Sequence, residues 1–558
     1  MAYKVGISTG FWNIGKDPSL LGLAQKAGGL GATGGIRFTQ LDLETISEFL
    51  EPRLKENMKR MQKDLGLEIG LHGEISQMGA FESAERKTWE QVHSRMVETV
   101  KRSAELGFKY INYHYSASII LQQEEARIRP FGFSYHVVTP TGEPFPVLCD
   151  KSKAAKEYVM RMMEINALGR HIMSEKPYQE LAEKKWEEIR RKYAERIKKA
   201  IEALRRNPEY QRLHPELQRQ QEEKINQEFS AAAQNEQERE TRGSRDFFYE
   251  AWKKSPYTRY VLEGGEIDAY MVVAHSMKEA GDPLWTSIVG NLTPEEAYND
   301  KPLQFNAAVA AKYIEGHFAA VKNKDLDGKT VKDFVGDKEL YILFENPEAG
   351  AGQEGLYRFF NPLEFYHLIK KISSPYFKMT IDFEHMLTQR IDPDKLVKDA
   401  PEDFGKQIKM LHLGEPKPYH PAHIPIPLGS QAQEVLYKWI FAFRKKGFSD
   451  GYLIFERGAG RRPGDQSAFN VFEHSIWVLR QISKFLDNDT EPDQLPPEFF
   501  GMSFDNKDIW ARQLVTIREH AWDPLHDVLA IPEEKHTFLG GEAVRKGKAQ
   551  EWEKRKFR

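Results

Sequence analysis

The chain has 558 residues, 40% of them hydrophobic, and a formal net charge of −3 at pH 7. This length exceeds the roughly 250 residues of an ordinary barrel domain, and the near-neutral charge excludes a global field that would attract nucleic acid. A single cysteine, Cys149, excludes internal disulfides and a cysteine-rich zinc site, and no apolar run reaches the ~18 residues of a membrane span, so we expect a cytoplasmic protein with no membrane partner.

Short apolar runs recur along the chain, and helical stretches separate most of them. Most of these runs are continuously apolar rather than alternating, which is typical of parallel strands buried on both faces. An open doubly wound sheet would also alternate strands with helices, but a count of eight favours a closed (β/α)8 TIM barrel, an α/β fold. The expected strands are residues 4–8, 35–38, 67–72, 108–114, 340–345, 377–382, 408–412 and 452–456.

The fourth and fifth expected strands are separated by a long segment. A helix near residues 302–322 can supply the crossover between them, so residues 122–300 are predicted to be a mostly helical insertion. The insertion is expected to open with a β-hairpin that turns at Thr141 and Gly142. Its polar stretch 222–244 is expected to be mobile. A long charged helix between these parts carries an apolar stripe of Trp186, Ile189, Tyr193, Ile197, Ile201 and Leu204.

The predicted domain organisation is a barrel in two halves, residues 1–121 and 301–495, with the insertion between them and a basic C-terminal extension at 496–558. Because the insertion leaves from the C-terminal end of the fourth strand, we expect it to pack beside or above the barrel mouth. Its apolar stripe must be buried, either against the barrel as a lid or against another subunit of a homo-oligomer.

Six successive strands each carry a histidine or an acidic residue at the C-terminal end, where barrels build their active sites. Burying so many carboxylates together without cations would be costly, and a divalent metal is the simplest compensation. Imidazole and carboxylate without thiolate suit zinc, manganese or iron. The candidate metal ligands are His72, His114, Glu345, Asp382, His385, His412, His423 and Glu456.

Three arginines, Arg457, Arg461 and Arg462, lie among glycines just after the eighth strand. Barrels often bind phosphate in this loop, and arginine side chains match phosphate oxygens. A solvated loop is an equally good interpretation. Residues 184–206 are also basic, which fits the polar face of an exposed helix, a nucleic-acid clamp or an oligomer contact.

Two motifs resemble a known family. The sequence FENPEAGAGQEG, which contains Glu345, and the step Asp382-Phe-Glu-His385 resemble the xylose-isomerase-like TIM barrels and, within them, the endonuclease IV group (AP endonuclease family 2). The resemblance covers most strand ends and neither the insertion nor the tail. It implies three zinc ions. His72, His114 and Glu345 would hold the first, while Glu345 would bridge to a second completed by Asp382, His412 and Glu456.

In that family the third ion would be held by His385 and a downstream aspartate-X-histidine pair. This sequence has no such pair after the seventh strand; His420 and His423 lie nearby, so the third site is incomplete. The family's DNA-penetrating tyrosine and leucine are also missing, because residues 75–77 are Ile-Ser-Gln.

The resemblance implies a zinc-dependent phosphodiester hydrolase acting on DNA, as in DNA repair, with two or three ions. Glu345 would orient a metal-held hydroxide toward phosphorus. The alternative is an isomerase or epimerase of a sugar or sugar phosphate, with one manganese, magnesium or cobalt ion on Glu345, Asp382, His412 and Glu456. The two glutamates would then be the catalytic residues, exchanging protons with the sugar. A non-catalytic scaffold is a third hypothesis, and the metal content distinguishes the three.

Overall fold

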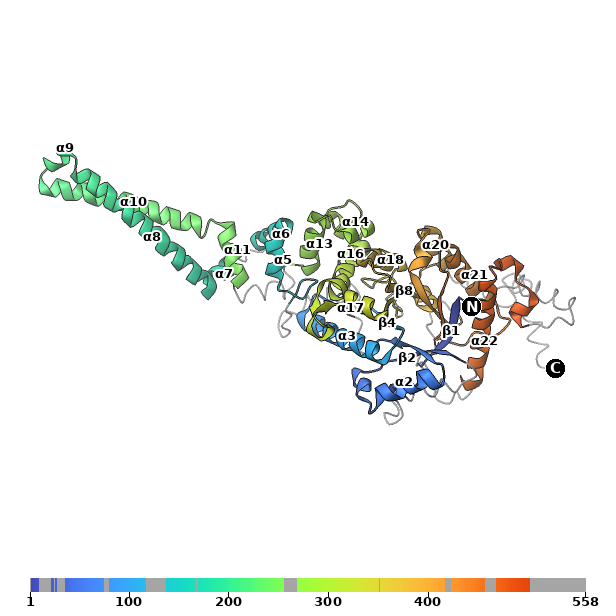
Figure 1. The fold of residues 1–558 in the computed structure, drawn as a ribbon. Helices are drawn as coiled ribbons and strands as arrows, with labels where there is room; N and C mark the ends of the chain where they lie inside the picture. The colour runs from blue at the N-terminus through green and yellow to red at the C-terminus, as the bar shows by residue number, and fades with distance from the viewer. Residues whose placement is uncertain are drawn as a thin grey trace, which may run out of the picture.

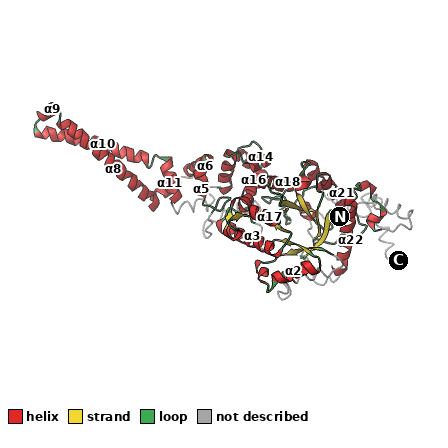
Figure 2. Cartoon of the chain, in the orientation of Figure 1, coloured by secondary structure: helices red, strands yellow, loops and turns green. Residues whose placement is uncertain are grey.

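The computed structural model describes residues 2–9, 22–24, 26–27, 36–74, 80–116, 137–165, 169–254, 268–350, 352–416, 423–456 and 468–501. It contains a closed barrel of eight parallel strands, in the order β1-β10-β9-β8-β7-β4-β3-β2 (Figures 1 and 2). The predicted barrel is therefore confirmed. The strands are β1 (Tyr3–Ser8), β2 (Phe38–Asp42), β3 (Glu68–His72), β4 (Tyr110–His114), β7 (Tyr341–Glu345), β8 (Phe377–Asp382), β9 (Ile408–Leu413) and β10 (Gly451–Phe455).

The second strand lies further along the chain than predicted. It was expected at residues 35–38, but β2 begins at Phe38 and continues through Thr39 and Gln40 to Asp42. The apolar pattern misplaced it because three of its five residues are polar and still buried.

The barrel closes across the insertion. β4 pairs directly with β7, with Tyr110 opposite Tyr341 and His114 opposite Glu345. The barrel is completed where β1 pairs with β10, beginning with Tyr3 opposite Gly451. All eight strands therefore direct their C-terminal ends to the same rim.

Helices surround the strands, and α3 shows how local sequence fixes one of them. The Glu85 side chain accepts hydrogen bonds from the backbone N–H groups of Lys87 and Thr88, and Gly107 ends the helix in the left-handed conformation at φ 75°. The helices around the barrel are α2 (Leu54–Asp64), α3 itself (Arg86–Leu106), α16 (Pro302–Glu315), α17 (Val331–Lys338), α18 (Pro362–Ile372), α20 (Pro393–Asp399), α21 (Gln431–Lys445) and α22 (Ala468–Asp487).

Side chains fill the barrel interior below the C-terminal rim of the strands. Phe38, Tyr110, Leu343, Met410, Tyr452 and Ile454 form a separate buried cluster. Gly70 on β3 makes room for this layer, because a Cβ at that position would lie 2.3 Å from the Tyr110 ring. The interior is thus a packed core that supports the side chains at the strand ends.

The insertion is mostly helical, as expected. Its helices are α5 (Phe145–Lys151), α6 (Lys153–Ile165), α7 (Gly169–Ser174), α8 (Lys176–Arg205), α9 (Pro208–Gln211), α10 (Pro215–Glu240), α11 (Arg245–Lys254), α13 (Ala269–Glu279), α14 (Pro283–Ile288) and α15 (Pro294–Asp300). The single cysteine, Cys149, is buried in α5 and free. No described helix is long and apolar enough to cross a membrane.

The long helices α8 and α10 form a hairpin that projects away from the barrel (Figure 1). The middle of its apolar stripe is buried within the hairpin, where Ile189 and Tyr193 pack with Ala233 and Phe229, while the rest of the stripe is partly buried. The expected placement of this part at the barrel mouth is therefore wrong, because the stripe finds its partner inside the insertion. Most of the stretch 222–244, which was expected to be mobile, belongs to the helix α10, and its mobility stays a prediction.

The predicted β-hairpin is only partly present. Its turn exists: the Thr139 N–H donates to the Glu143 carbonyl at 2.8 Å, and Gly142 has φ 75°. The return strand does not form, because residues 145–151 are the helix α5. Pro144 and Pro146 lack the N–H groups that a strand ladder needs. The division at residues 121, 300 and 495 stays a prediction, and most of the C-terminal extension lies outside the described residues.

Candidate metal centre

The strand-end side chains converge at the C-terminal rim of the barrel. His72 ends β3, His114 ends β4, Glu345 ends β7 and Asp382 ends β8. His412 lies near the end of β9, and Glu456 directly follows β10. The structure thus brings all six together, while their role as ligands stays a prediction.

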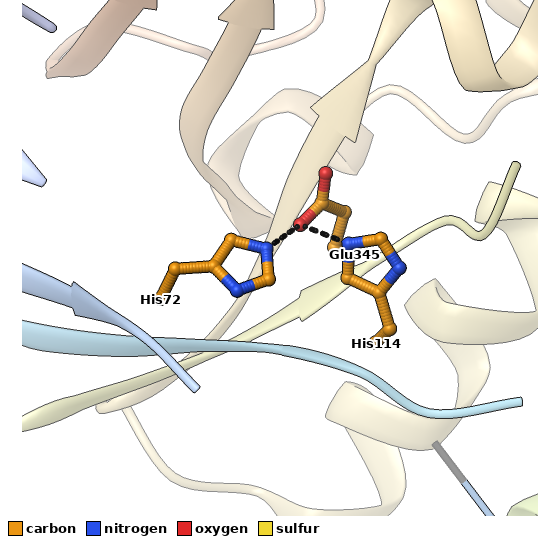
Figure 3. Close-up of side chains that lie close together, drawn as sticks. All are labelled: His72, His114 and Glu345. Carbon is orange, nitrogen blue, oxygen red and sulfur yellow. Dashed lines mark ion pairs between the residues drawn. The ribbon is translucent and has the colours of Figure 1, made fainter. Parts of the chain in front are cut away.

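A first group contains His72, His114 and Glu345 (Figure 3). Oε2 of Glu345 lies 3.3 Å from Nε2 of His72 and 3.0 Å from Nε2 of His114. Nδ1 of His72 lies 3.0 Å from the Gly73 carbonyl, which fixes the ring with Nε2 toward the carboxylate. Burial lowers the pKa of His72, but the hydrogen bond and charge of Glu345 outweigh it and raise the pKa to about 9.

A second group contains Glu345, Asp382, His412 and Glu456. Nδ1 of His412 lies 2.8 Å from Oε1 of Glu345 and 3.8 Å from Oδ2 of Asp382, and it contacts Oε2 of Glu456. The two oxygens of Glu345 therefore face two different groups. This arrangement would allow the carboxylate to bridge two ions.

The second group fits a divalent ion by its charge. Three carboxylates, of which Glu345 and Asp382 are buried and Glu456 is partly buried, face one imidazole, so negative charge is in excess. Burial raises the pKa of Asp382 to about 7, and the carboxylates of Glu456 and Glu345 add to the shift against the opposing His423 and His412 charges. Burial lowers the pKa of His412, but Glu345 and Glu456 hold it well above its ordinary value. A cation among these oxygens would compensate their charge and take the place of the proton on Nδ1.

A third group contains Glu348, His385 and His423. Nε2 of His385 lies 4.0 Å from Oε2 of Glu348, and the rings of His385 and His423 are 5.3 Å apart. Nδ1 of His385 lies 2.9 Å from the Asn346 carbonyl, which leaves Nε2 facing Glu348. Sequence reasoning missed Glu348, although it follows Glu345 by three residues in FENPEAG. It offers the carboxylate that the absent aspartate-X-histidine pair would have supplied.

Polar residues within the barrel strands and one more at the rim were also missed. Asn112 donates to Oε2 of Glu345 and accepts from Thr380 Oγ1 at 2.7 Å. Gln40 lies beneath His412, and Asp42 ends β2 beside His72. Burial raises the pKa of Asp42 to about 6. The only available sequence signal was a polar residue inside an otherwise apolar run.

Several predicted site residues lie outside the described residues. These are His420 and the proposed phosphate-binding residues Arg457, Arg461 and Arg462. Phosphate binding after the eighth strand therefore stays a prediction.

The fold and these groups define a class of protein: a (β/α)8 barrel with a candidate divalent-metal centre at the C-terminal rim of its strands. No family model and no curated protein matches the sequence.

Solved structures with a similar arrangement include sugar epimerases. A D-tagatose 3-epimerase-like protein is 10% identical, with a TM-score of 0.40, over 87% of this chain and 99% of its own. A D-psicose 3-epimerase is 11% identical, with a TM-score of 0.39, over 86% and 98%. A 3-keto-D-glucoside 4-epimerase from E. coli is 9% identical, with a TM-score of 0.35, over 86% and 99%. The expected closer resemblance to endonuclease IV has no support among these structures, and likeness at this level gives no basis for a substrate.

Proposed function

We propose that the protein is a divalent-metal-dependent isomerase or epimerase of a small sugar or sugar phosphate. The observation that carries this proposal is the group of Glu345, Asp382, His412 and Glu456, whose ligand atoms lie within 4.8 Å of one another. Four such donors suffice for one ion of the manganese, magnesium or cobalt type. The two glutamates come from β7 and β10, with β8 and β9 between them, and so approach from different sides of the centre.

Isomerisation and epimerisation of sugars both begin by removing a proton from a carbon next to a carbonyl group. A bound ion would polarise that carbonyl. One glutamate would accept the proton, and the other would return a proton to the same or the neighbouring carbon. His72 and His114 contact Oε2 of Glu345 and would stabilise its ionised form, which exists before it accepts a proton or after it has donated one.

The charges at the rim support a small substrate. Glu348 is 53% exposed beside the buried site, and Asp42 adds a further carboxylate. With a net charge of −3 for the whole chain, these acids oppose the approach of a polyanion such as DNA.

A second candidate function is phosphodiester hydrolysis. It is favoured by the two separate contacts of Glu345 and by the third group of Glu348, His385 and His423. Two or three ions could stabilise both the attacking and the leaving oxygen of a phosphate diester. An isomerase needs only one ion, which leaves His72, His114, His385 and His423 without a role as ligands. Phosphodiester hydrolysis with two or three ions would use these histidines as metal ligands.

Metal stoichiometry and proton exchange distinguish the candidates. We expect the purified protein to hold one tightly bound Mn²⁺ or Co²⁺ per chain. It should incorporate deuterium from D₂O next to the carbonyl of a ketohexose or its phosphate, observed by NMR, and Asp382→Asn should abolish the exchange. The proposal is wrong if the protein holds two or three zinc ions, exchanges no sugar proton and cleaves abasic-site duplex DNA with an activity that falls as salt rises.

A further inference from the structure

Gln40 is a buried polar residue that the proposed chemistry does not use. It lies in β2, directly above the apolar layer that contains Phe38 and Tyr110. Its side chain is fully buried. Its Nε2 has no hydrogen-bond partner among the described residues, whereas its Oε1 has two contacts. Burying an amide in this way is costly, so the contacts of Oε1 indicate why Gln40 is there.

The contacts of Gln40 lead to the candidate metal centre. Its Oε1 accepts a hydrogen bond from the Tyr110 hydroxyl at 2.9 Å and lies 3.2 Å from Nε2 of His412. A carbonyl oxygen has two lone pairs, so it can accept from both donors. Gln40 therefore meets the ring nitrogen of His412 that points away from the carboxylates.

This contact determines which nitrogen of His412 can bind a cation. A neutral imidazole carries one N–H and one lone pair. If Nε2–H donates to Gln40, the lone pair is on Nδ1, and Nδ1 faces Glu345, Asp382 and Glu456. Metal-binding histidines commonly have their other nitrogen fixed by such a partner.

We infer that Gln40 is a positioning residue that holds the His412 ring, in the tautomer protonated on Nε2, for metal binding through Nδ1. The inference rests on the metal centre of the proposed function and not on its substrate. It assigns a function to Gln40, a buried polar residue of the barrel interior that the proposed reaction itself does not use.

The test measures Zn²⁺ affinity of the full chain by competition with a chromophoric chelator. Gln40→Met keeps the length of the side chain and removes the acceptor, so affinity should fall about 10- to 100-fold. Gln40→Glu keeps an acceptor and should bind Zn²⁺ at least as tightly as the wild type. Tyr110→Phe leaves the contact between Gln40 and His412 intact, and its affinity should stay within about threefold.

Gln433→Met is the matched control. Gln433 is also fully buried, and its amide donates to the Phe499 carbonyl at 2.6 Å rather than contacting a candidate metal ligand. This variant should lose stability without losing Zn²⁺ affinity, and thermal unfolding of all variants reports whether each is folded.

A second readout is the His412 ring itself in ¹⁵N-histidine-labelled, Zn²⁺-loaded protein. The wild type should show a proton on Nε2 that exchanges slowly with solvent, and Gln40→Met should show faster exchange. Wild-type affinity in Gln40→Met, or a proton on Nδ1 in the loaded protein, would overturn the inference alone. A wild-type chain that binds no Zn²⁺ would overturn it together with the metal centre. Zn²⁺ binding without sugar proton exchange would refute only the proposed function.

Discussion

Glu456 is the carboxylate whose loss tests the candidate centre most directly. Glu456→Gln keeps the shape of the side chain and removes one of the three negative charges around His412. We expect metal affinity to fall by about tenfold or more, turnover to be nearly abolished and the fold to remain intact. Metal content by mass spectrometry and thermal unfolding of the metal-free protein check this. Wild-type metal content would mean that Glu456 has a structural role.

The residues that sequence reasoning found share one property. His72, Glu345 and Asp382 each end an apolar run, so the change from apolar to ionisable side chain marks both the strand end and the site. Gln40 and Asn112 lie within strands and face the barrel interior, where a sequence alone does not separate a buried amide from a solvated one. Glu348 follows its strand without a spacing that identifies it as a ligand.

At the scale of the element, α18 carries a titratable group at its N-terminus. The Glu364 carboxylate accepts hydrogen bonds at 3.0 Å from the N–H groups of Phe360 and Asn361 as part of a capping box. Burial raises its pKa to about 8, against an ordinary value of 4.5. Between these two pH values the folded state therefore keeps a proton that the unfolded state releases. The stability that Glu364 contributes relative to high pH is completely present below about pH 4.5 and is lost as the pH rises through about 8.

Glu364→Gln removes this titration and keeps a capping side chain. We expect the variant to be more stable than the wild type at about pH 9, by on the order of 1–2 kcal/mol, with the advantage disappearing toward about pH 5. Urea unfolding at both pH values checks this. Parallel stability curves for the two proteins would show that Glu364 does not titrate in this range.

A second element with a pH-dependent contribution is the π-helical turn η4 (Gly316–Ala320). Its His317 is fully buried, stacks on Trp89 at 4.5 Å and lies Nδ1 to Nδ1 at 3.1 Å from His93 of α3. Burial and the neighbouring His93 lower its pKa well below 6.5. Below pH 6.5 His317 therefore binds a proton in the unfolded state but not in the folded state, so the free energy of unfolding falls as the pH falls.

His317→Gln should reduce this acid sensitivity. For one such group the wild type loses about 1.4 kcal/mol per pH unit below its unfolded pKa, and the variant should show a correspondingly shallower slope. Melting temperatures between about pH 7 and pH 5 measure the difference. Because all other ionisable groups are the same in both proteins, the difference reports on His317 and its neighbour His93, and identical slopes would contradict the prediction.

At the scale of the whole molecule, the hairpin of α8 and α10 is the part least tied to the barrel. Along the hairpin α8 packs against α10, and at its base α8 packs against the neighbouring helices α7 and α11. Replacing residues 176–240 by a short glycine-serine linker should leave metal binding unchanged and change the melting temperature by only about 2 °C. Mass by light scattering tests whether the hairpin joins copies of the chain: fewer chains per particle than in the wild type would support the predicted homo-oligomer. Loss of the barrel fold in this variant would contradict the expectation that the barrel folds without the hairpin.

The sequence was sufficient to predict the barrel because seven of its eight strands overlap almost fully with the predicted apolar runs, and the run expected at 35–38 ends where β2 begins. It was not sufficient to place the hairpin. A helix with one apolar stripe, such as the segment with Ile189 and Tyr193, must pack against something, but its pattern does not say whether the partner is the barrel, another chain or a later helix. The partner, around Phe229 and Ala233, lies in a stretch whose polar residues concealed its few apolar ones.

The strands β4 and β7 pair directly, with Tyr110 opposite Tyr341, although the insertion separates them in the sequence. Closing the barrel at this point joins strands that an ordinary crossover would separate by about 30 residues, whereas here they are about 230 residues apart. Loop-closure entropy rises only with the logarithm of length, so the extra cost is about 2 kcal/mol for a fully flexible segment. A segment that folds on its own brings its two ends together and lowers that cost further. The rim after β4 is thus a position where the barrel can accept a whole additional unit with little effect on the equilibrium that keeps it closed.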